Sequence, residues 1–129
     1  MGNECKVLIV DDSKLARIML QRAISVYNSE WVVTQAANGA EGLIAFEEEK
    51  PDIILVDYHM PGISGLELAE KLRALDKTIP IALCTANIQN TIQEQAKAMG
   101  IAFVGKPITN EIVAEFLEFA DKSRAERPQ

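Results

Sequence analysis

Short runs of Val, Ile and Leu alternate along the chain with longer segments in which apolar residues recur every three or four positions. The short runs have the length and composition of β-strands, and the longer segments have the period of amphipathic helices. The predicted strands are Lys6–Val10, Trp31–Ala36, Ile53–Val56, Ile81–Cys84 and Ala102–Val104. The predicted helices are Ser13–Tyr27, Gly39–Glu49, Gly65–Leu75, Asn90–Met99 and Asn110 to about Ala125.

This alternation predicts an α/β fold with a parallel sheet and helices on both of its faces. Crossovers between parallel strands are right-handed, so five such units fit an open, doubly wound sheet. The run Ile53–Val56 is apolar at every position, which predicts a central strand buried on both faces. Asp12 or Ser13 can cap the first helix, and Gly100 can end the fourth.

Length and composition set the class of protein. The chain has 129 residues, of which 48% are hydrophobic, and this predicts a single domain over residues 1–129, with its core from about 5 to 122 and a tail from 123 to 129. The formal net charge of −6 disfavours nucleic acid as a partner. Residues 1–6 include polar and charged residues rather than an apolar stretch, and no apolar run approaches the roughly 20 residues of a membrane span, so we expect no membrane insertion and a cytoplasmic location.

Two cysteines, Cys5 and Cys84, stand beside apolar strand-like runs, far apart and without a CxxC spacing. Buried free thiols are favoured over a disulfide or a metal site.

Polar residues follow or end four of the predicted strands: Asp11 and Asp12 the first, Asp57 the third, Thr85 the fourth and Lys106 the fifth. Each alone has an ordinary explanation as a helix cap, a turn residue, a strand end or a solvated charge. Together they would meet at one edge, because parallel strands share their carboxyl ends. Close carboxylates repel by roughly 4 kcal/mol per pair at an effective dielectric of 20, so Lys106 and a hard cation such as Mg²⁺ must offset the repulsion. The pattern predicts a magnesium and phosphate site with an aspartate as nucleophile.

The ordered set resembles the receiver domain of two-component signalling, and is similar to its stand-alone, chemotaxis-type regulators. The likeness runs from Lys6 to about Ala120 and implies a flavodoxin-like sheet with strand order 2-1-3-4-5 and five helices. The motifs that carry it are Asp11-Asp12-Ser13, Asp57 with Met60-Pro61-Gly62 and Gly65, Thr85-Ala86, and Lys106-Pro107.

The resemblance implies a role for each matching residue. Asp57 would accept the phosphoryl group, and Thr85 and Lys106 would bind it. Asp11, Asp12, Asp57 and the backbone carbonyl of His59 would hold Mg²⁺, for which Mn²⁺ could substitute.

The resemblance also implies a switch. Phe103 stands where the family has an aromatic that turns inward on activation, although a plain core residue is the alternative, and the Lys106-Pro107 bond would be cis. The side chains of His59 and Asn87 occupy positions that influence how long the phosphoryl group lasts. His59 is the only histidine, which excludes an imidazole metal cluster.

The expected function is that of a single-domain response regulator, a phosphoacceptor switch rather than a turnover enzyme. Its donor would be a histidine kinase, a phosphotransfer protein or a small acyl phosphate. Its fourth-helix, fifth-strand and fifth-helix surface would control a protein target, with a phosphatase as a further partner. We expect a monomer or a weak phosphorylation-dependent dimer.

Two features favour that output surface. The last helix has an apolar arc wider than one core requires. The fourth helix is polar and predicted to pack weakly, as expected of a segment that moves or receives a partner, and a solvated face is the alternative explanation for it. The arc consists of Ile112, Val113, Phe116, Leu117, Phe119 and Ala120.

Three rival functions start from similar residues. A haloacid-dehalogenase-type phosphatase would need a second aspartate where His59 stands, and a flavodoxin-like FMN carrier would need a phosphate-cradling loop where the chain has Asp11-Asp12-Ser13. A receiver-fold scaffold that works without phosphorylation remains the closest alternative.

Overall fold

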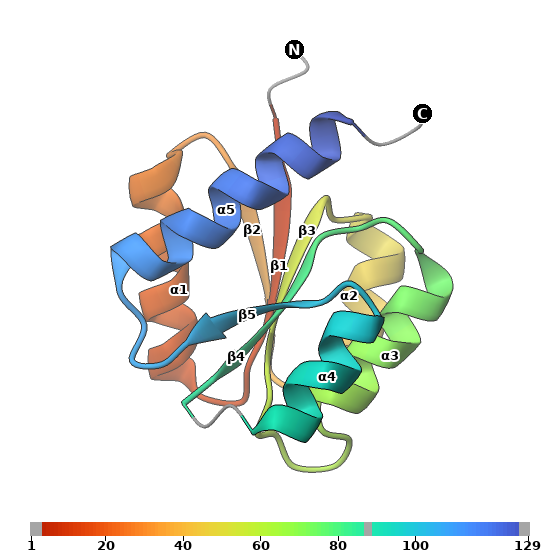
Figure 1. The fold of residues 1–129 in the computed structure, drawn as a ribbon. Coiled ribbons are helices and arrows are strands. Elements are labelled where there is room, and N and C mark those ends of the chain that lie inside the picture. Colours follow the sequence, from red (N-terminus) through yellow and green to blue (C-terminus); the bar gives the residue numbers. More distant parts are fainter. Residues whose placement is uncertain (1–3, 87–88, 127–129) are drawn as a thin grey trace.

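The structure, a computed structural model, describes residues 4–86 and 89–126. Its centre is a parallel sheet in the order β2-β1-β3-β4-β5 (Figure 1). This confirms the predicted doubly wound α/β fold and its strand order. The strands are β1 (Lys6–Val10), β2 (Val32–Ala36), β3 (Ile53–Asp57), β4 (Ile81–Thr85) and β5 (Ala102–Gly105). The helices are α1 (Lys14–Tyr27), α2 (Gly39–Glu49), α3 (Gly65–Leu75), α4 (Asn90–Ala98) and α5 (Asn110–Ala125).

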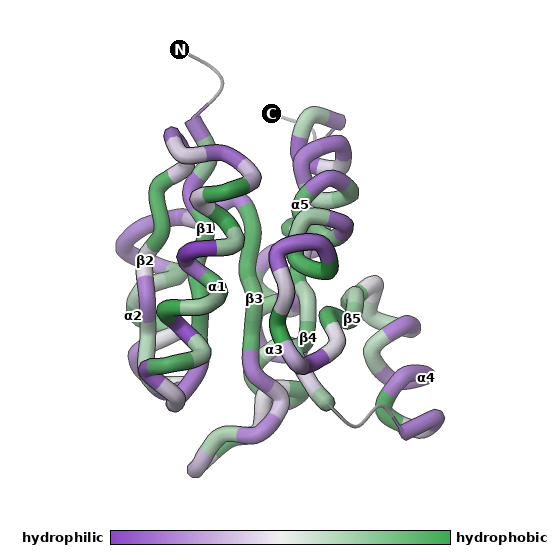
Figure 2. Tube along the Cα trace, turned by 90° about the vertical axis from the view of Figure 1, so that its left-hand side faces the viewer, coloured by the Kyte–Doolittle hydropathy of each residue, from purple (hydrophilic) through white to green (hydrophobic). Residues whose placement is uncertain are grey.

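The helices form two layers, with α1 and α5 on one face of the sheet and α2, α3 and α4 on the other (Figure 1). Successive side chains of a strand point to opposite faces, so each strand contributes side chains to two hydrophobic clusters. Ile9 and Leu55 pack in a first cluster with α1 and α5, whereas Leu8 and Ile54 pack in a second cluster with α3 and α4. All five residues of β3 are buried, as predicted for the central strand, and the hydrophobic colour runs along most of it in Figure 2.

Three strands extend one residue beyond their predicted ends. Asp57 pairs with Cys84, and Thr85 pairs with Gly105. The hydrophobic pattern stops before these positions because their residues are polar or lack a side chain, while the backbone ladder continues. At the other end of a strand, Trp31 was predicted to begin β2, but its N–H donates to the Asn28 carbonyl at 3.3 Å in the turn after α1.

The helix ends follow the predicted capping chemistry. Ser13 is the N-cap of α1, and its side chain accepts from the Ala16 N–H at 3.2 Å. Helix α4 ends at Ala98, one residue early, with Met99 as its C-cap and Gly100 at a positive φ of 68°. Residues 127–129 of the predicted tail lie outside the described part of the chain.

Both cysteines are buried free thiols, as predicted. Burial raises the pKa of Cys5 and that of Cys84 to about 12.

Candidate functional site

The structure buries three polar or charged side chains within its described residues: Asp11, Asp57 and Thr85, which are 0%, 4% and 1% exposed. All three belong to the set predicted at the carboxyl edge of the sheet. Burying polar groups is costly unless they are paired or hydrogen-bonded. Their concentration at one edge marks it as the candidate site.

The Lys106 ammonium joins the two buried carboxylates. Its Nζ donates to Asp57 Oδ1 at 2.8 Å and lies 3.8 Å from Asp11 Oδ2. Burial alone would lower the pKa of Lys106, but the hydrogen bond and the charges of Asp57 and Asp11 outweigh it, so the pKa is raised. Lys106 is therefore a permanent cation at neutral pH.

The two oxygens of the buried Asp11 carboxylate have different surroundings. Its Oδ1 accepts from the Ser13 N–H at 2.9 Å, whereas its buried Oδ2 has no hydrogen-bond partner among the described residues. Burial, followed by the charge of Asp57, raises the pKa of Asp11 despite the Ser13 hydrogen bond and the charge of Lys106. The site holds more negative charge than its one ammonium offsets.

A divalent cation fits this set of donors. One carboxylate oxygen from each of Asp11, Asp12 and Asp57 lies within 4.8 Å of the others, and Asp12 is exposed. Mg²⁺ binds proteins through one or a few carboxylates and keeps several waters. Asp11 Oδ2, which has no hydrogen bond within the described part of the chain, and the exposed side of the cluster at Asp12 meet both requirements.

The close approach of α3 to the end of β3 depends on Gly65, the first residue of that helix. A Cβ on this residue would lie 2.1 Å from the Asp57 carbonyl oxygen, and its N–H donates to the Tyr58 carbonyl at 2.9 Å. Helix α3 thus begins directly against the end of β3. Ser64 and Glu67 form a capping box that fixes this start.

Arg17 is a positioning residue that the sequence did not reveal. Its Nη1 donates to the Asp11 carbonyl at 2.7 Å and its Nε donates to Gln35 Oε1 at 3.0 Å. The guanidinium thereby ties the backbone behind the acidic pair to β2. A bond to a carbonyl carries no sequence signal, because every residue has one.

Thr85 and Phe103 lie on the other face of the sheet from the two buried aspartates. Leu83 belongs to the second cluster and pairs with Phe103, which packs against the same cluster. Strand alternation then directs Thr85 to this face, and Asp57 to the face of Leu55. The Lys106 N–H donates to the Thr85 carbonyl at 3.1 Å, which joins the ends of β4 and β5.

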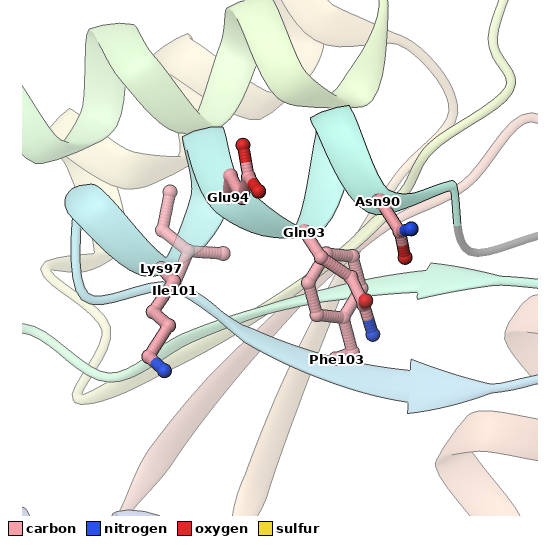
Figure 3. A pocket seen from close by; sticks show the side chains of 6 residues that line it. All are labelled: Asn90, Gln93, Glu94, Lys97, Ile101 and Phe103. Carbon is pink, nitrogen blue, oxygen red and sulfur yellow. The ribbon is translucent and has the colours of Figure 1, made fainter.

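Phe103 lies in a groove of about 380 Å³ between α4 and β5. Its ring faces the helix beside Gln93 (Figure 3). The groove is lined by Asn90, Gln93, Glu94, Lys97, Ile101 and Phe103.

The structure also describes the Lys106-Pro107 bond and His59, two further parts of the predicted site. The Lys106-Pro107 peptide is cis, as the resemblance implied. His59 is exposed and its ring meets that of Tyr58 edge-on at 4.8 Å. Asn87 lies outside the described residues.

Comparisons with known proteins identify the family to which the chain belongs. A family model described as "Response regulator receiver domain" matches residues 7–118. The chain is 37% identical over 101 residues to the sporulation initiation phosphotransferase F of Bacillus subtilis, covering 78% of each chain. It is 36% identical over 117 residues to the positive alginate biosynthesis regulatory protein of Pseudomonas aeruginosa, and spans 47% of that protein's length against 90% of its own.

A solved structure extends the likeness to three dimensions. The chemotaxis response regulator CheY4 of Vibrio cholerae superposes with a TM-score of 0.81 at 28% identity, over 92% of this chain and 99% of that one. The chain belongs to the response regulator receiver domain family, the receivers of two-component systems. Across the described residues, the structure has no helix with the length and apolarity to cross a membrane.

Proposed function

We propose that this receiver is a phosphoryl-accepting switch in which Asp57 is the acceptor. The observation that carries the proposal is the buried Asp57 carboxylate, paired at 2.8 Å with Lys106 beside a second buried carboxylate whose Oδ2 has no hydrogen-bond partner among the described residues. Phosphoryl transfer needs positioning and charge neutralisation more than covalent chemistry from the protein. The similarity to the sporulation initiation phosphotransferase F of Bacillus subtilis supports the same chemistry.

Asp11, Asp12 and Asp57 would hold Mg²⁺ or Mn²⁺, with the backbone carbonyl of His59 as a further ligand. When bound, the metal neutralises the carboxylates and the phosphoryl oxygens. Lys106 supplies the protein's own cation, and its raised pKa keeps it protonated. Thr85 would donate its hydroxyl to a phosphoryl oxygen.

The donor would be a histidine kinase, a phosphotransfer protein or a small acyl phosphate. The chain would assist its own phosphorylation and its later hydrolysis without acting as a turnover enzyme, and a separate phosphatase is compatible with this role.

A phosphoryl group on Asp57 would add roughly two negative charges and three acceptor oxygens. Thr85 would respond to them from the face that also carries Phe103. The groove between α4 and β5 would then change shape, and the surface of α4, β5 and α5 would select a protein partner.

Intact-mass measurement after incubation with acetyl phosphate and Mg²⁺ tests the proposal. Wild type should gain the mass of one phosphoryl group, and Asp57→Ala or an EDTA-treated sample should not. Asp121→Ala, which removes a carboxylate on α5 that pairs with Arg124, is the matched control and should be modified like wild type. If wild type stays unmodified by acetyl phosphate and by a phosphorylated histidine kinase, the phosphorylation-independent scaffold replaces the switch.

A further inference from the structure

The guanidinium of Arg73, near the end of α3, binds the backbone of two other segments. Its Nε donates to the Met99 carbonyl at 2.9 Å and its Nη2 to the Gly100 carbonyl at 3.1 Å, both just after α4. Its Nη1 donates to the Ile79 carbonyl at 2.7 Å and to the Asp76 carbonyl at 3.3 Å. One half-buried side chain thus joins the end of α3, the α3–β4 loop and the end of α4.

This end of α4 is fixed by its own backbone as well. Gly100, at φ 68°, donates its N–H to the Lys97 carbonyl, and the Ile101 N–H donates to the Ala96 carbonyl at 2.9 Å. This is the pattern of a Schellman motif, and its usual apolar contact is present because Ala96 and Ile101 both belong to the second core cluster. A cation at a helix C-terminus also complements the helix dipole.

The opposite end of α4 has much weaker attachments. Its N-cap, Gln89, makes no side-chain capping hydrogen bond, and the first turn contains no acidic residue. Among the residues of the helix, Ala96 alone is buried, and it lies in the C-terminal half. Helix stability in proteins comes mainly from such packing, so α4 is held at one end.

We propose that Arg73 is a pivot for α4, fixing its C-terminal end while its N-terminal end is free to swing. The stimulus for the swing, loading of the site at Asp57, rests on the function proposed above; the anchoring itself does not. A helix that turns about its C-terminus moves most at Asn90 and Gln93 and least at Lys97. The groove over Phe103 would therefore open or close from its Asn90 end (Figure 3).

Amide hydrogen exchange followed by NMR tests the pivot, with the Gln93 N–H, bonded to the Gln89 carbonyl, and the Ile101 N–H as reporters of the two ends. Three chains are compared: wild type, Arg73→Ala, and the matched control Lys71→Ala, which removes an exposed charge from the same helix. Each is measured alone and with Mg²⁺ and beryllofluoride, a mimic of a carboxyl-bound phosphoryl group.

Without beryllofluoride, Arg73→Ala should speed exchange at Ile101 roughly tenfold or more, the factor that corresponds to losing one or two ordinary hydrogen bonds. Lys71→Ala should leave it unchanged, and exchange in β3 should stay slow in all three chains. If Arg73→Ala fails to fold, Arg73→Lys, which keeps the charge and loses the forked donors, takes its place. Unchanged exchange at Ile101 overturns the anchor.

With beryllofluoride, wild type should change at Gln93 and not at Ile101, whereas Arg73→Ala should change at both. A merely structural arginine would lower protection equally with and without the mimic. An equal response at both ends of wild type α4 overturns the pivot. If no amide of α4 responds to beryllofluoride while Arg73→Ala still speeds exchange at Ile101, the proposed stimulus is wrong and the anchoring by Arg73 is retained.

Discussion

Asp11→Asn should make the metal-free protein more stable. The Asp11 carboxylate is fully buried and lies within 4.8 Å of two other carboxylates, and its Oδ2 lacks a hydrogen bond among the described residues. At an effective dielectric of 20, unit charges at that distance repel by about 3.5 kcal/mol, whereas Lys106 at 3.8 Å attracts by about 4 kcal/mol. One ammonium thus offsets about one of the two repulsions.

Asparagine removes the charge and keeps the oxygen that accepts from the Ser13 N–H. Water screens the share of the repulsion that comes from exposed Asp12. We therefore expect Asp11→Asn to raise the free energy of unfolding by about 1–2 kcal/mol at pH 7 without metal, or a thermal midpoint roughly 3–8 °C higher.

The pH dependence gives the sign of this effect. Burial raises the pKa of Asp11 in the folded state above the ordinary value of an aspartate, so the folded protein binds this proton more tightly than the unfolded chain. The stability gained in this way is fully present below the unfolded pKa and is lost as the pH rises through the folded pKa. The advantage of Asp11→Asn should therefore be absent in acid and appear as the pH rises toward 7.

Urea unfolding with and without Mg²⁺ is the assay. Wild type should gain stability with Mg²⁺ by mass action, about 2.7 kcal/mol at a concentration a hundred times the dissociation constant, and Asp11→Asn should lose most of this gain. The matched control is Asp52→Asn. The Asp52 carboxylate accepts from the Lys6 N–H at the opposite edge of the sheet, so this variant should keep the gain in stability with Mg²⁺. The reasoning is refuted if Asp11→Asn is less stable than wild type at pH 7 without metal, or responds to Mg²⁺ as wild type does.

Three further experiments test other parts of the structure. Gly65→Ala should destabilise the fold by more than about 2 kcal/mol and abolish phosphorylation, since its Cβ would overlap the last carbonyl of β3. The control Gly62→Ala, at φ 85° with open space around it, should cost only about 1 kcal/mol and leave phosphorylation intact. Equal losses of stability for the two variants in urea unfolding would contradict this. Phe119→Asp, on a side chain 58% exposed, should change stability by less than about 0.5 kcal/mol and leave phosphorylation intact. It should weaken self-association or partner binding. Unchanged sedimentation and unchanged binding would remove the α5 surface from the output site. Cys5 and Cys84, with pKa values of about 12, should react with a thiol reagent only when urea unfolds the chain, and rapid labelling of the native protein would show that burial does not protect them.

The sequence predicted the site because the strand topology determines which residues meet at the carboxyl edge of the sheet. Once the chain is recognised as alternating strands and helices, parallel pairing brings the strand ends together whatever their separation along the chain. The structure accordingly places Asp11, Asp57 and Lys106 in contact. Topology could not predict that Asp11 Oδ2 has no hydrogen-bond partner among the described residues, since this depends on the local bond from the Ser13 N–H to Oδ1.

The residues that sequence reasoning missed act on the backbone. Arg17 and Arg73 bind carbonyl oxygens of distant segments, and a carbonyl is the same group at every position. Neither arginine stands in a motif that spacing could reveal. Strand ends were missed for a related reason, because ladder pairing continues into Asp57 and Thr85 where the apolar pattern has stopped.

The apolar arc of α5 shows what periodicity leaves undecided. The arc was too wide for one core, but the sequence did not tell which residues exceed it. Phe116 is 5% exposed and Phe119 is 58% exposed, with their rings 6.5 Å apart. The boundary between them depends on how far α5 is rotated against α1 and the sheet, which packing alone decides.

The division of the site between the two faces of the sheet has a consequence for signalling. Asp11 and Asp57 follow Ile9 and Leu55 on the face of α1 and α5, whereas Thr85 and Phe103 belong to the face of α4. We therefore expect a change in charge at the proposed acceptor to reach the groove through a group at this edge of the sheet. Thr85 meets this requirement, because its strand pairs with β3 at Asp57 and with β5 at Gly105. Removing the hydroxyl should accordingly separate loading of the site from the response of α4.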